Sequence, residues 1–254
     1  MKQIPNILTL ANLFCGALAV IFILQAPTFI AGYQGHDYMV TSPPPVYWAS
    51  VLIGIAAVFD FLDGFAARLL KVQSPIGKEL DSLADVITFG LAPGMIMYQL
   101  LKGAYMQQPD AMEVSLLAVV PALLIPCFAA YRLAKFNLDQ RQTVNFIGVP
   151  TPAVGLLIAS FPLLILYNHM HLDIWLQKVW VLYGLVILLC VLMVCNIPFF
   201  SLKMKDLSWK RNALRYILLV LTLISIPLLH WASVPFAFFL YIALSVGKFW
   251  LFPD

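Results

Sequence analysis

Long runs of hydrophobic residues dominate the chain, and short segments between them hold most of the charged residues. A membrane-spanning helix needs about 20 mainly apolar residues. The last two of the segments that meet this requirement are separated only by Trp231–Ser233, which predicts a tight helical hairpin. The segments in which we expect a transmembrane helix are Ile7–Ala31, Val46–Leu70, Leu83–Leu101, Val114–Ala134, Val149–Tyr167, Val179–Phe200, Ala213–His230 and Val234–Phe252.

Prolines mark a loop and two helix starts in the sequence. The segment from Gly32 to Pro45 is expected to be a long outer loop, because its three final prolines block a helix there. Ser74-Pro75 and Thr151-Pro152 each predict a helix start, with a capping residue followed by a first-turn proline.

The composition also indicates a membrane protein. Of the 254 residues, 62% are hydrophobic and 11% are charged, whereas a soluble domain is about half apolar and about a quarter charged. No internal repeat or soluble domain is evident. We therefore expect an all-α, polytopic bundle of about eight membrane helices, forming one domain over residues 1–254. Its catalytic core would cover roughly residues 4–200, and residues 201–254 would form a basic inner loop and the C-terminal hairpin.

The basic residues predict the orientation of this bundle. If the N-terminus is cytoplasmic, 13 of the 15 Lys and Arg residues lie at the inner face, and only Lys102 and Lys178 lie outside. This asymmetry follows the positive-inside rule and predicts a multi-pass protein of the cell membrane. The net charge of +3 reflects this topology, so we expect no nucleic-acid partner. The inner residues are Lys2, Arg68, Lys71, Lys78, Arg132, Lys135, Arg141, Lys203, Lys205, Lys210, Arg211, Arg215 and Lys248.

Four aspartates lie within or beside the second and third spans. Asp60 and Asp63 are three residues apart and share one helix face, and Asp81 and Asp85 share a face with Gly77 at spacings of four. Charged residues in membrane spans are costly and usually functional. Because the second span ends inside and the third begins inside, we expect the two faces to meet near the cytoplasmic boundary.

Four neighbouring carboxylates cannot all stay ionised without a counter-charge, and one nearby arginine, Arg68, is not enough. One or two divalent cations supply that charge, and oxygen ligands favour Mg²⁺ or Mn²⁺. Such ions bind phosphates and assist in-line phosphoryl displacement. Gly64 and Ala67 leave room for a ligand beside the helix. The alternatives are an intramembrane ion-pair network or a cation transporter, although transporters usually hold such groups near the midplane, in repeats.

The spacing of these residues resembles the signature of the CDP-alcohol phosphotransferases. It reads Asp60-x-x-Asp63-Gly64-x-x-Ala67-Arg68, eight residues, then Gly77-x-x-x-Asp81-x-x-x-Asp85. The resemblance implies an enzyme that moves a phosphatidyl or similar group from a CDP-linked lipid to an alcohol and releases CMP. It implies that Asp60, Asp63 and Asp81 ligate the metal ions and that Asp85 is the general base, and we expect Asp85 to belong to the metal site as well. We expect the CDP-lipid to be bound by residues of this signature, together with two polar residues of the first helix: Asn6, Thr9, Asp60, Gly64, Ala67, Arg68 and Gly77.

Four further segments resemble the phosphatidylserine synthase branch of that family: Ile4–Asn12, Asp81–Gly90, Arg132–Asn137 and Phe146–Pro152. The resemblance implies that CDP-diacylglycerol is the donor and L-serine the acceptor. Glycerol phosphate, inositol phosphate or choline is the alternative acceptor. Family members are commonly homodimers, so a homodimer is expected here.

The expected serine site lies at the inner end of the fourth span, where Arg132, Lys135 and Asn137 occur together. An arginine fork suits the carboxylate of an amino acid, but ordinary positive-inside anchoring explains the two basic residues as well. A polar stripe on the first span, which includes Asn6 and Thr9, is likewise open to two interpretations. It contacts either the nucleotide or a neighbouring helix.

Overall fold

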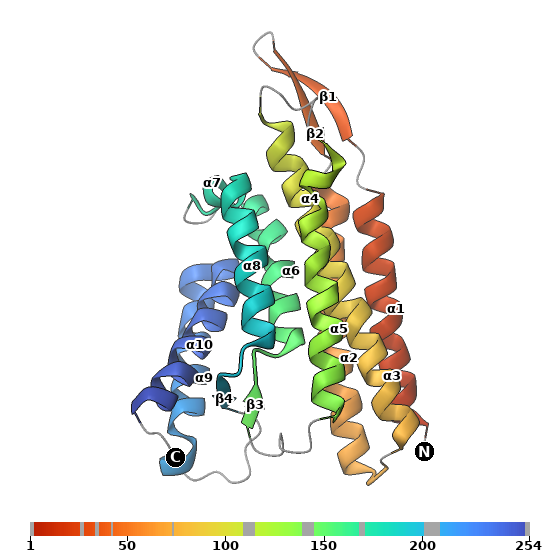
Figure 1. Ribbon diagram of the computed structural model, residues 1–254, viewed down its shortest axis with the longest axis vertical. Helices are drawn as coiled ribbons and strands as arrows, with labels where there is room; N and C mark the ends of the chain where they lie inside the picture. Colours follow the sequence, from red (N-terminus) through yellow and green to blue (C-terminus); the bar gives the residue numbers. More distant parts are fainter. Residues whose placement is uncertain are drawn as a thin grey trace.

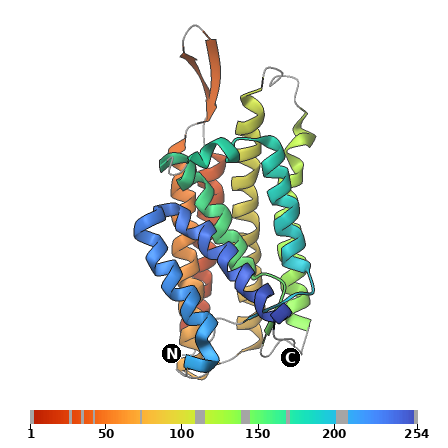
Figure 2. The same cartoon turned by 90° about the vertical axis from the view of Figure 1, so that its left-hand side faces the viewer.

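The computed structural model describes residues 3–25, 28–33, 36–41, 43–72, 74–108, 115–138, 145–167, 171–200 and 209–251. These residues form one bundle of long helices, and a two-stranded hairpin projects from one end (Figure 1, Figure 2). In chain order the elements are α1 Ile4–Leu24, β1 Thr28–Tyr33, β2 His36–Thr41, α2 Pro43–Leu69, α3 Pro75–Asp85, η1 Val86–Leu91, α4 Ala92–Met106, η3 Leu116–Ala118, η4 Val120–Leu123, α5 Leu124–Leu138, β3 Asn145–Ile147, α6 Thr151–Tyr167, α7 Asp173–Leu176, α8 Val179–Val194, β4 Pro198–Phe200, α9 Trp209–Leu229, η6 His230–Ala232 and α10 Ser233–Leu251.

Several of these helices are long and apolar enough to cross a bilayer. Within the described residues, four stretches qualify by length and composition, and α6 and α8 are shorter apolar helices. The four stretches are Ile4–Leu24, Pro45–Leu69, Pro75–Met106 and Asn212–Trp250. Each of the eight expected spans has a helical counterpart in the described part of the chain. The helical bundle is therefore confirmed, whereas a membrane crossing by every one of the eight helices stays a prediction.

The first helix shows how the bundle is packed. Its buried residues recur every three or four positions and include small or polar ones such as Thr9, Asn12 and Gly16. Its exposed residues include Ile7 and Phe14. Thr9 bonds to Asp63 of α2, and Gly16 lies against Thr88 of η1. The helix therefore turns polar and small side chains toward its neighbours in the bundle and apolar ones outward. This arrangement suits a lipid-facing helix, because lipid tails solvate apolar side chains.

One continuous helical run, Pro75–Met106, carries α3, η1 and α4. It begins as the sequence predicts, because Ser74 caps it by accepting a hydrogen bond from the Gly77 backbone N–H at 3.0 Å, and Pro75 occupies the first turn. Directly after Asp85 the helix widens to a π-helix over Val86–Leu91. Such widened turns are rare and often occur at functional sites.

Two sequence predictions about the segment that joins α1 to α2 are wrong. The first helix ends at Leu24, not Ala31, and β1 pairs antiparallel with β2 from Thr28↔Thr41 to Tyr33↔His36. The prolines at 43–45 begin α2 instead of blocking it. Proline is tolerated there because the backbone N–H groups of a first helical turn have no partner within the helix.

A second short ribbon, which the sequence does not predict, joins two loops near the opposite end of the bundle. The α8 helix ends at Val194 instead of continuing to Phe200, and β4 pairs antiparallel with β3, with Asn145↔Phe200 and Ile147↔Pro198 as the outer pairs. Two backbone hydrogen bonds extend this junction: Gly148 N to Ile197 O at 3.1 Å and Val149 N to Leu192 O at 2.9 Å. The ribbon leads directly into Thr151 at the start of α6, where the sequence predicts a helix start.

The basic residues divide between the two ends of the bundle. Arg68, Lys71 and Lys78 lie at or beside the α2–α3 turn, at the end where α1 begins and α10 ends (Figure 1). Lys102, near the end of α4, and Lys178, just before α8, lie toward the other end. Four of the predicted inner residues lie outside the described part of the chain: Lys2, Arg141, Lys203 and Lys205.

We predict that Gly148→Ala destabilises the protein. Gly148 has φ +76°, and a Cβ atom at this position would clash with the carbonyl oxygen of Met193. The loss should be about 1–3 kcal/mol and would appear as a lower melting temperature of the detergent-solubilised protein. Gly184→Ala on α8 is the control, because a Cβ there meets nothing within 4 Å. Equal melting temperatures for the two variants would contradict the prediction.

Candidate active site

Three of the four aspartates meet where α2 ends and α3 begins. Asp60 and Asp63 come from α2 and Asp81 from α3, and one carboxylate oxygen of each lies within 4.8 Å of the others. Asp63 is buried, and the other two are half-buried. Opposite oxygens around one Mg²⁺ ion lie about 4.2 Å apart. The three carboxylates are therefore close enough to share one divalent ion with small side-chain movements.

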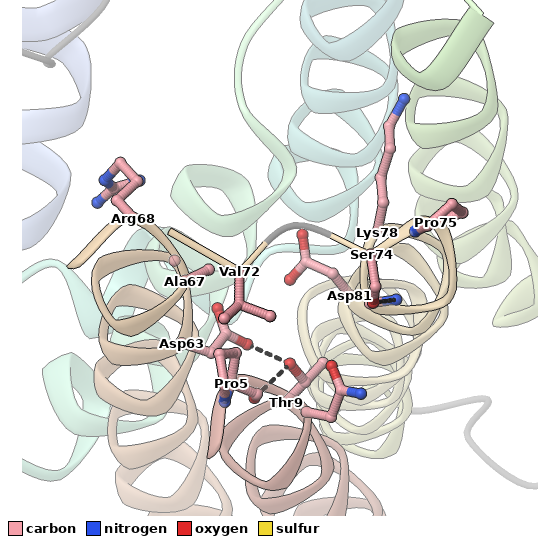
Figure 3. A pocket seen from close by; sticks show the side chains of 13 residues that line it. Pro5, Thr9, Asp63, Ala67, Arg68, Val72, Ser74, Pro75, Lys78 and Asp81 are labelled. Carbon is pink, nitrogen blue, oxygen red and sulfur yellow. Dashed lines mark hydrogen bonds between the residues drawn. The ribbon is translucent and has the colours of Figure 1, made fainter. Parts of the chain in front are cut away.

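Helix α1 contacts this group of carboxylates through Thr9. Thr9 Oγ1 lies 2.6 Å from Asp63 Oδ2 and 3.0 Å from the carbonyl oxygen of Pro5 (Figure 3). A hydroxyl has one proton to donate, and the shorter contact, to the charged group, is the stronger one. Thr9 thus fixes one oxygen of Asp63 and leaves the other for a ligand.

The donor set fits a hard divalent cation. The three aspartates offer only oxygen, and Asp81 Oδ1 is buried without a hydrogen-bond partner. Buried polar atoms normally have a partner, so such an atom marks an incomplete site. The nearest lysine on α3, Lys78, extends away from Asp63 and Asp81, and its Nζ donates to the Asn137 carbonyl at 3.2 Å (Figure 3). Mg²⁺ and Mn²⁺ are the ions that prefer such ligands.

Asp85 lies apart from the three-oxygen group. It is the last residue of α3, is 7% exposed, and has an unpartnered buried Oδ1. It lies close enough to Asn12 and Arg132 to interact with both. Both polar side-chain atoms of the fully buried Asn12 also lack a hydrogen-bond partner. The expected place of Asp85 among the metal ligands stays a prediction, and its burial beside the group suits a proton acceptor.

A cavity of about 610 Å³ opens beside the carboxylates, between the first turns of α1, the end of α2 and the start of α3 (Figure 3). Cavities of about 300–1,000 Å³ hold small-molecule ligands and cofactors. Of the seven residues expected to bind a CDP-lipid, all but Asp60 line it. The full lining is Pro5, Asn6, Thr9, Asp63, Gly64, Ala67, Arg68, Val72, Ser74, Pro75, Gly77, Lys78 and Asp81.

Gly77 shows why this cavity needs small residues. A Cβ atom there would lie 3.0 Å from Ser74 Oγ and 3.1 Å from Asn6 Oδ1. Any side chain at this position would therefore displace the helix cap or Asn6.

The sequence did not single out Pro5, Val72 or Lys78 as lining residues. The spacing of the aspartates along α2 and α3 could not indicate Pro5 and Val72, because Pro5 comes from α1 and Val72 from the turn between α2 and α3.

The residues expected to bind the acceptor do not form one cluster. Arg132 is 6% exposed and donates from Nη1 to Thr151 Oγ1 at 3.2 Å, and its buried Nε has no partner among the described residues. Lys135 instead donates to Asn196 Oδ1 at 3.2 Å, and Asn137 donates to Ser82 Oγ at 2.8 Å. Of the three, only Arg132 points into the buried region beside Asp85. Thr151, which the sequence did not single out, holds it there.

The sequence is similar to a family of phosphatidyltransferases and to several of their relatives in bacteria and archaea. The family model described as CDP-alcohol phosphatidyltransferase matches residues 2–191. A CDP-diacylglycerol–serine O-phosphatidyltransferase of Helicobacter pylori (strain J99) is 32% identical over 233 residues, which are 91% of this chain and 84% of that protein. The protein of the same name from Bacillus subtilis (strain 168) is 33% identical over 163 residues, 63% of this chain and 77% of its own. One from Methanocaldococcus jannaschii is 37% identical over 110 residues, 43% and 48% of the two chains.

The matched segment contains all four aspartates, the cavity lining and Arg132. It ends before β4, α9 and α10. The match favours an enzyme that transfers a phosphatidyl group over the cation transporter that the aspartates alone left open.

We predict that Asp60→Asn, Asp63→Asn and Asp81→Asn each weaken Mn²⁺ binding at least about tenfold, because each removes a charged oxygen from the three-oxygen group. Electron paramagnetic resonance of free Mn²⁺, titrated with purified protein in detergent, measures the affinity without requiring turnover. Asp173→Asn is the control, because Asp173 lies in α7 at the other end of the bundle (Figure 1). An affinity in Asp81→Asn equal to that of the control would exclude this metal site.

Proposed function

The chain belongs to the CDP-alcohol phosphatidyltransferase family, and from that premise we propose that it is a CDP-diacylglycerol–serine O-phosphatidyltransferase. It would transfer the phosphatidyl group of CDP-diacylglycerol to the hydroxyl of L-serine, giving phosphatidylserine and CMP. The observation that carries the reaction is the three-oxygen group of Asp60, Asp63 and Asp81, of which Asp63 and Asp81 line the cavity. The acceptor is supported by the relatives named for serine and by the buried Arg132.

The cavity suits the polar part of the donor. Arg68 on its wall provides positive charge, and Gly64, Ala67 and Gly77 let a nucleotide approach the helix backbone. Asn6 and Thr9 add hydrogen-bonding groups from α1. The apolar outer faces of α1 and α2 expose large side chains such as Phe14 and Phe61, so the two acyl chains can stay in lipid while the CDP group enters between the helices.

The acceptor would enter from the side of Arg132. The guanidinium group holds a carboxylate through paired N–H donors, and its unpartnered Nε is a donor still available for one. Arg132 and Asp85 lie near each other, so a serine held by its carboxylate would bring its hydroxyl toward Asp85.

The reaction needs one proton transfer and one displacement. Asp85 would accept the serine hydroxyl proton as the serine oxygen bonds to the phosphorus that carries diacylglycerol. The bond from that phosphorus to the CMP oxygen breaks, and CMP leaves with the electron pair. Bound Mg²⁺ or Mn²⁺ would neutralise the charge on the diphosphate and on the departing CMP. Direct attack is the simplest route, because no Cys or His lies beside these aspartates in the sequence to form a covalent intermediate.

The proposed enzyme is multi-pass, and its active site would face the cytoplasm, where serine is dissolved. The carboxylates lie at the end of the bundle that carries Arg68, Lys71 and Lys78, and positive residues favour the cytoplasmic side. By the same family resemblance we expect a homodimer.

We predict that purified protein releases CMP from CDP-diacylglycerol when L-serine and Mn²⁺ or Mg²⁺ are present. The test compares serine with glycerol 3-phosphate, inositol phosphate and choline under identical conditions, and identifies the lipid product by mass spectrometry. Asp81→Asn, which removes one oxygen from the three-oxygen group, is the inactive control. Release that depends on one of the other alcohols but not on serine would keep the reaction class and reject serine as the acceptor.

We predict that Asp85→Asn abolishes turnover and leaves CDP-diacylglycerol binding largely intact. Asparagine keeps the size of the side chain but cannot accept the serine proton, so the rate should fall by about 100-fold or more. Binding is measured separately, by isothermal titration with a CDP-lipid in the presence of Mn²⁺. Equal losses of binding and turnover would show that Asp85 acts in donor binding and not as a separate base.

A further inference from the structure

The C-terminal helix α10 contacts the acceptor side of the active site, although it lies beyond the segment that the family model matches. Its Tyr241 is 6% exposed. The ring lies against two residues of β4, stacked on Phe199 at 5.8 Å between centroids and edge-on to Phe200 at 5.1 Å. The hydroxyl donates to the Phe200 carbonyl oxygen at 3.0 Å. One side chain of α10 thus holds β4 by both ring contacts and a hydrogen bond.

Strand β4 transmits this constraint to the start of α6. Phe200 pairs with Asn145 of β3, and the Gly148 amide donates to Ile197, just before β4. Gly148 has a positive φ, which turns the chain sharply from β3 toward α6. The position of Thr151, three residues later, therefore depends on the position of β4.

Thr151 in turn holds Arg132. It is fully buried and accepts the hydrogen bond from Arg132 Nη1 at 3.2 Å. The Tyr241 phenol also lies near enough to Arg132 to interact with it electrostatically. One turn further along α10, the buried Ser245 side chain lies near the Tyr241 phenol. The Tyr241 phenol is therefore the polar group of α10 that lies near the guanidinium expected to bind the acceptor carboxylate.

We propose that Tyr241 is a positioning residue for the acceptor. It ties β4 in place, and through the β3–β4 ribbon and Thr151 it fixes the guanidinium of Arg132 at the angle that an acceptor carboxylate requires. Donor binding should not depend on Tyr241, because the described residues that line the donor cavity come from α1, α2, α3 and the turn between α2 and α3. The inference rests on the proposed function, since it assigns a carboxylate-bearing acceptor to Arg132.

The first test is Tyr241→Phe, which keeps the ring contacts and removes the hydroxyl. The serine KM should rise about three- to tenfold, the effect of losing one hydrogen bond, while the KM for CDP-diacylglycerol stays within twofold. Tyr131→Phe is the matched control, because Tyr131 lies next to Arg132 in the chain but is 62% exposed. A serine KM equal to that of the control, or equal rises in both KM values, would contradict the proposal.

A double variant separates positioning from a general effect on the fold. If Tyr241 acts through Thr151, Tyr241→Phe/Thr151→Val should have the serine KM of Thr151→Val alone, since the contact to Arg132 is already lost. Independent sites would instead give additive effects, and additivity would overturn the proposal. Loss of folded protein in Tyr241→Phe would also overturn it, because the hydroxyl would then serve the fold as a whole.

Hydrogen–deuterium exchange gives a readout without turnover. Peptides covering residues 145–151 should exchange faster in Tyr241→Phe than in Tyr131→Phe, because the Gly148 and Val149 amides are bonded across this junction. Unchanged exchange would contradict the proposal.

The failure of this inference can be told apart from the failure of the proposed function. If the wild-type protein does not use serine, both the proposed function and this inference are wrong. If it uses serine and Tyr241→Phe keeps the wild-type serine KM, only the inference is wrong.

Discussion

The mutual repulsion of three carboxylates in an apolar bundle is the constraint around which this structure is organised. Two like charges 4 Å apart repel by about 4 kcal/mol at an effective dielectric constant of 20, and a whole domain is stable by only about 5–15 kcal/mol. Asp60, Asp63 and Asp81 bring their oxygens within 4.8 Å of one another. Thr9 donates a hydrogen bond to one carboxylate oxygen of Asp63, and a divalent cation at this group would offset the repulsion and attract a diphosphate.

The sequence predicted the site better than the elements around it. The helical spacings of the aspartates identified the faces of α2 and α3, and the Ser74-Pro75 pair located the start of α3, because both depend on local geometry. The β1–β2 hairpin, the π-helix after Asp85 and the β3–β4 ribbon could not be predicted in this way. Each depends on contacts between distant segments, such as Ile147↔Pro198, and an apolar run does not reveal where its helix will stop.

The acceptor residues illustrate the same limit. Three polar residues near one helix end suggested a common pocket, but only Arg132 is buried beside Asp85. Lys135 and Asn137 point to Asn196 and Ser82 instead. Donor and acceptor would therefore approach from different sides, the donor between α1, α2 and α3 and the acceptor past α5, α6 and α10. Asp85 lies between the carboxylate group on the donor side and Arg132 on the acceptor side, where it would accept the proton of the attacking hydroxyl.

Locating the metal is the most direct test of this account. Crystals grown with Mn²⁺ and a CDP-lipid, measured at the manganese absorption edge, would place the ion by its anomalous signal. The account predicts a peak within about 2.0–2.6 Å of oxygens of Asp60, Asp63 and Asp81, next to the diphosphate of the donor. A donor bound in the cavity with no manganese peak at these three carboxylates would contradict it.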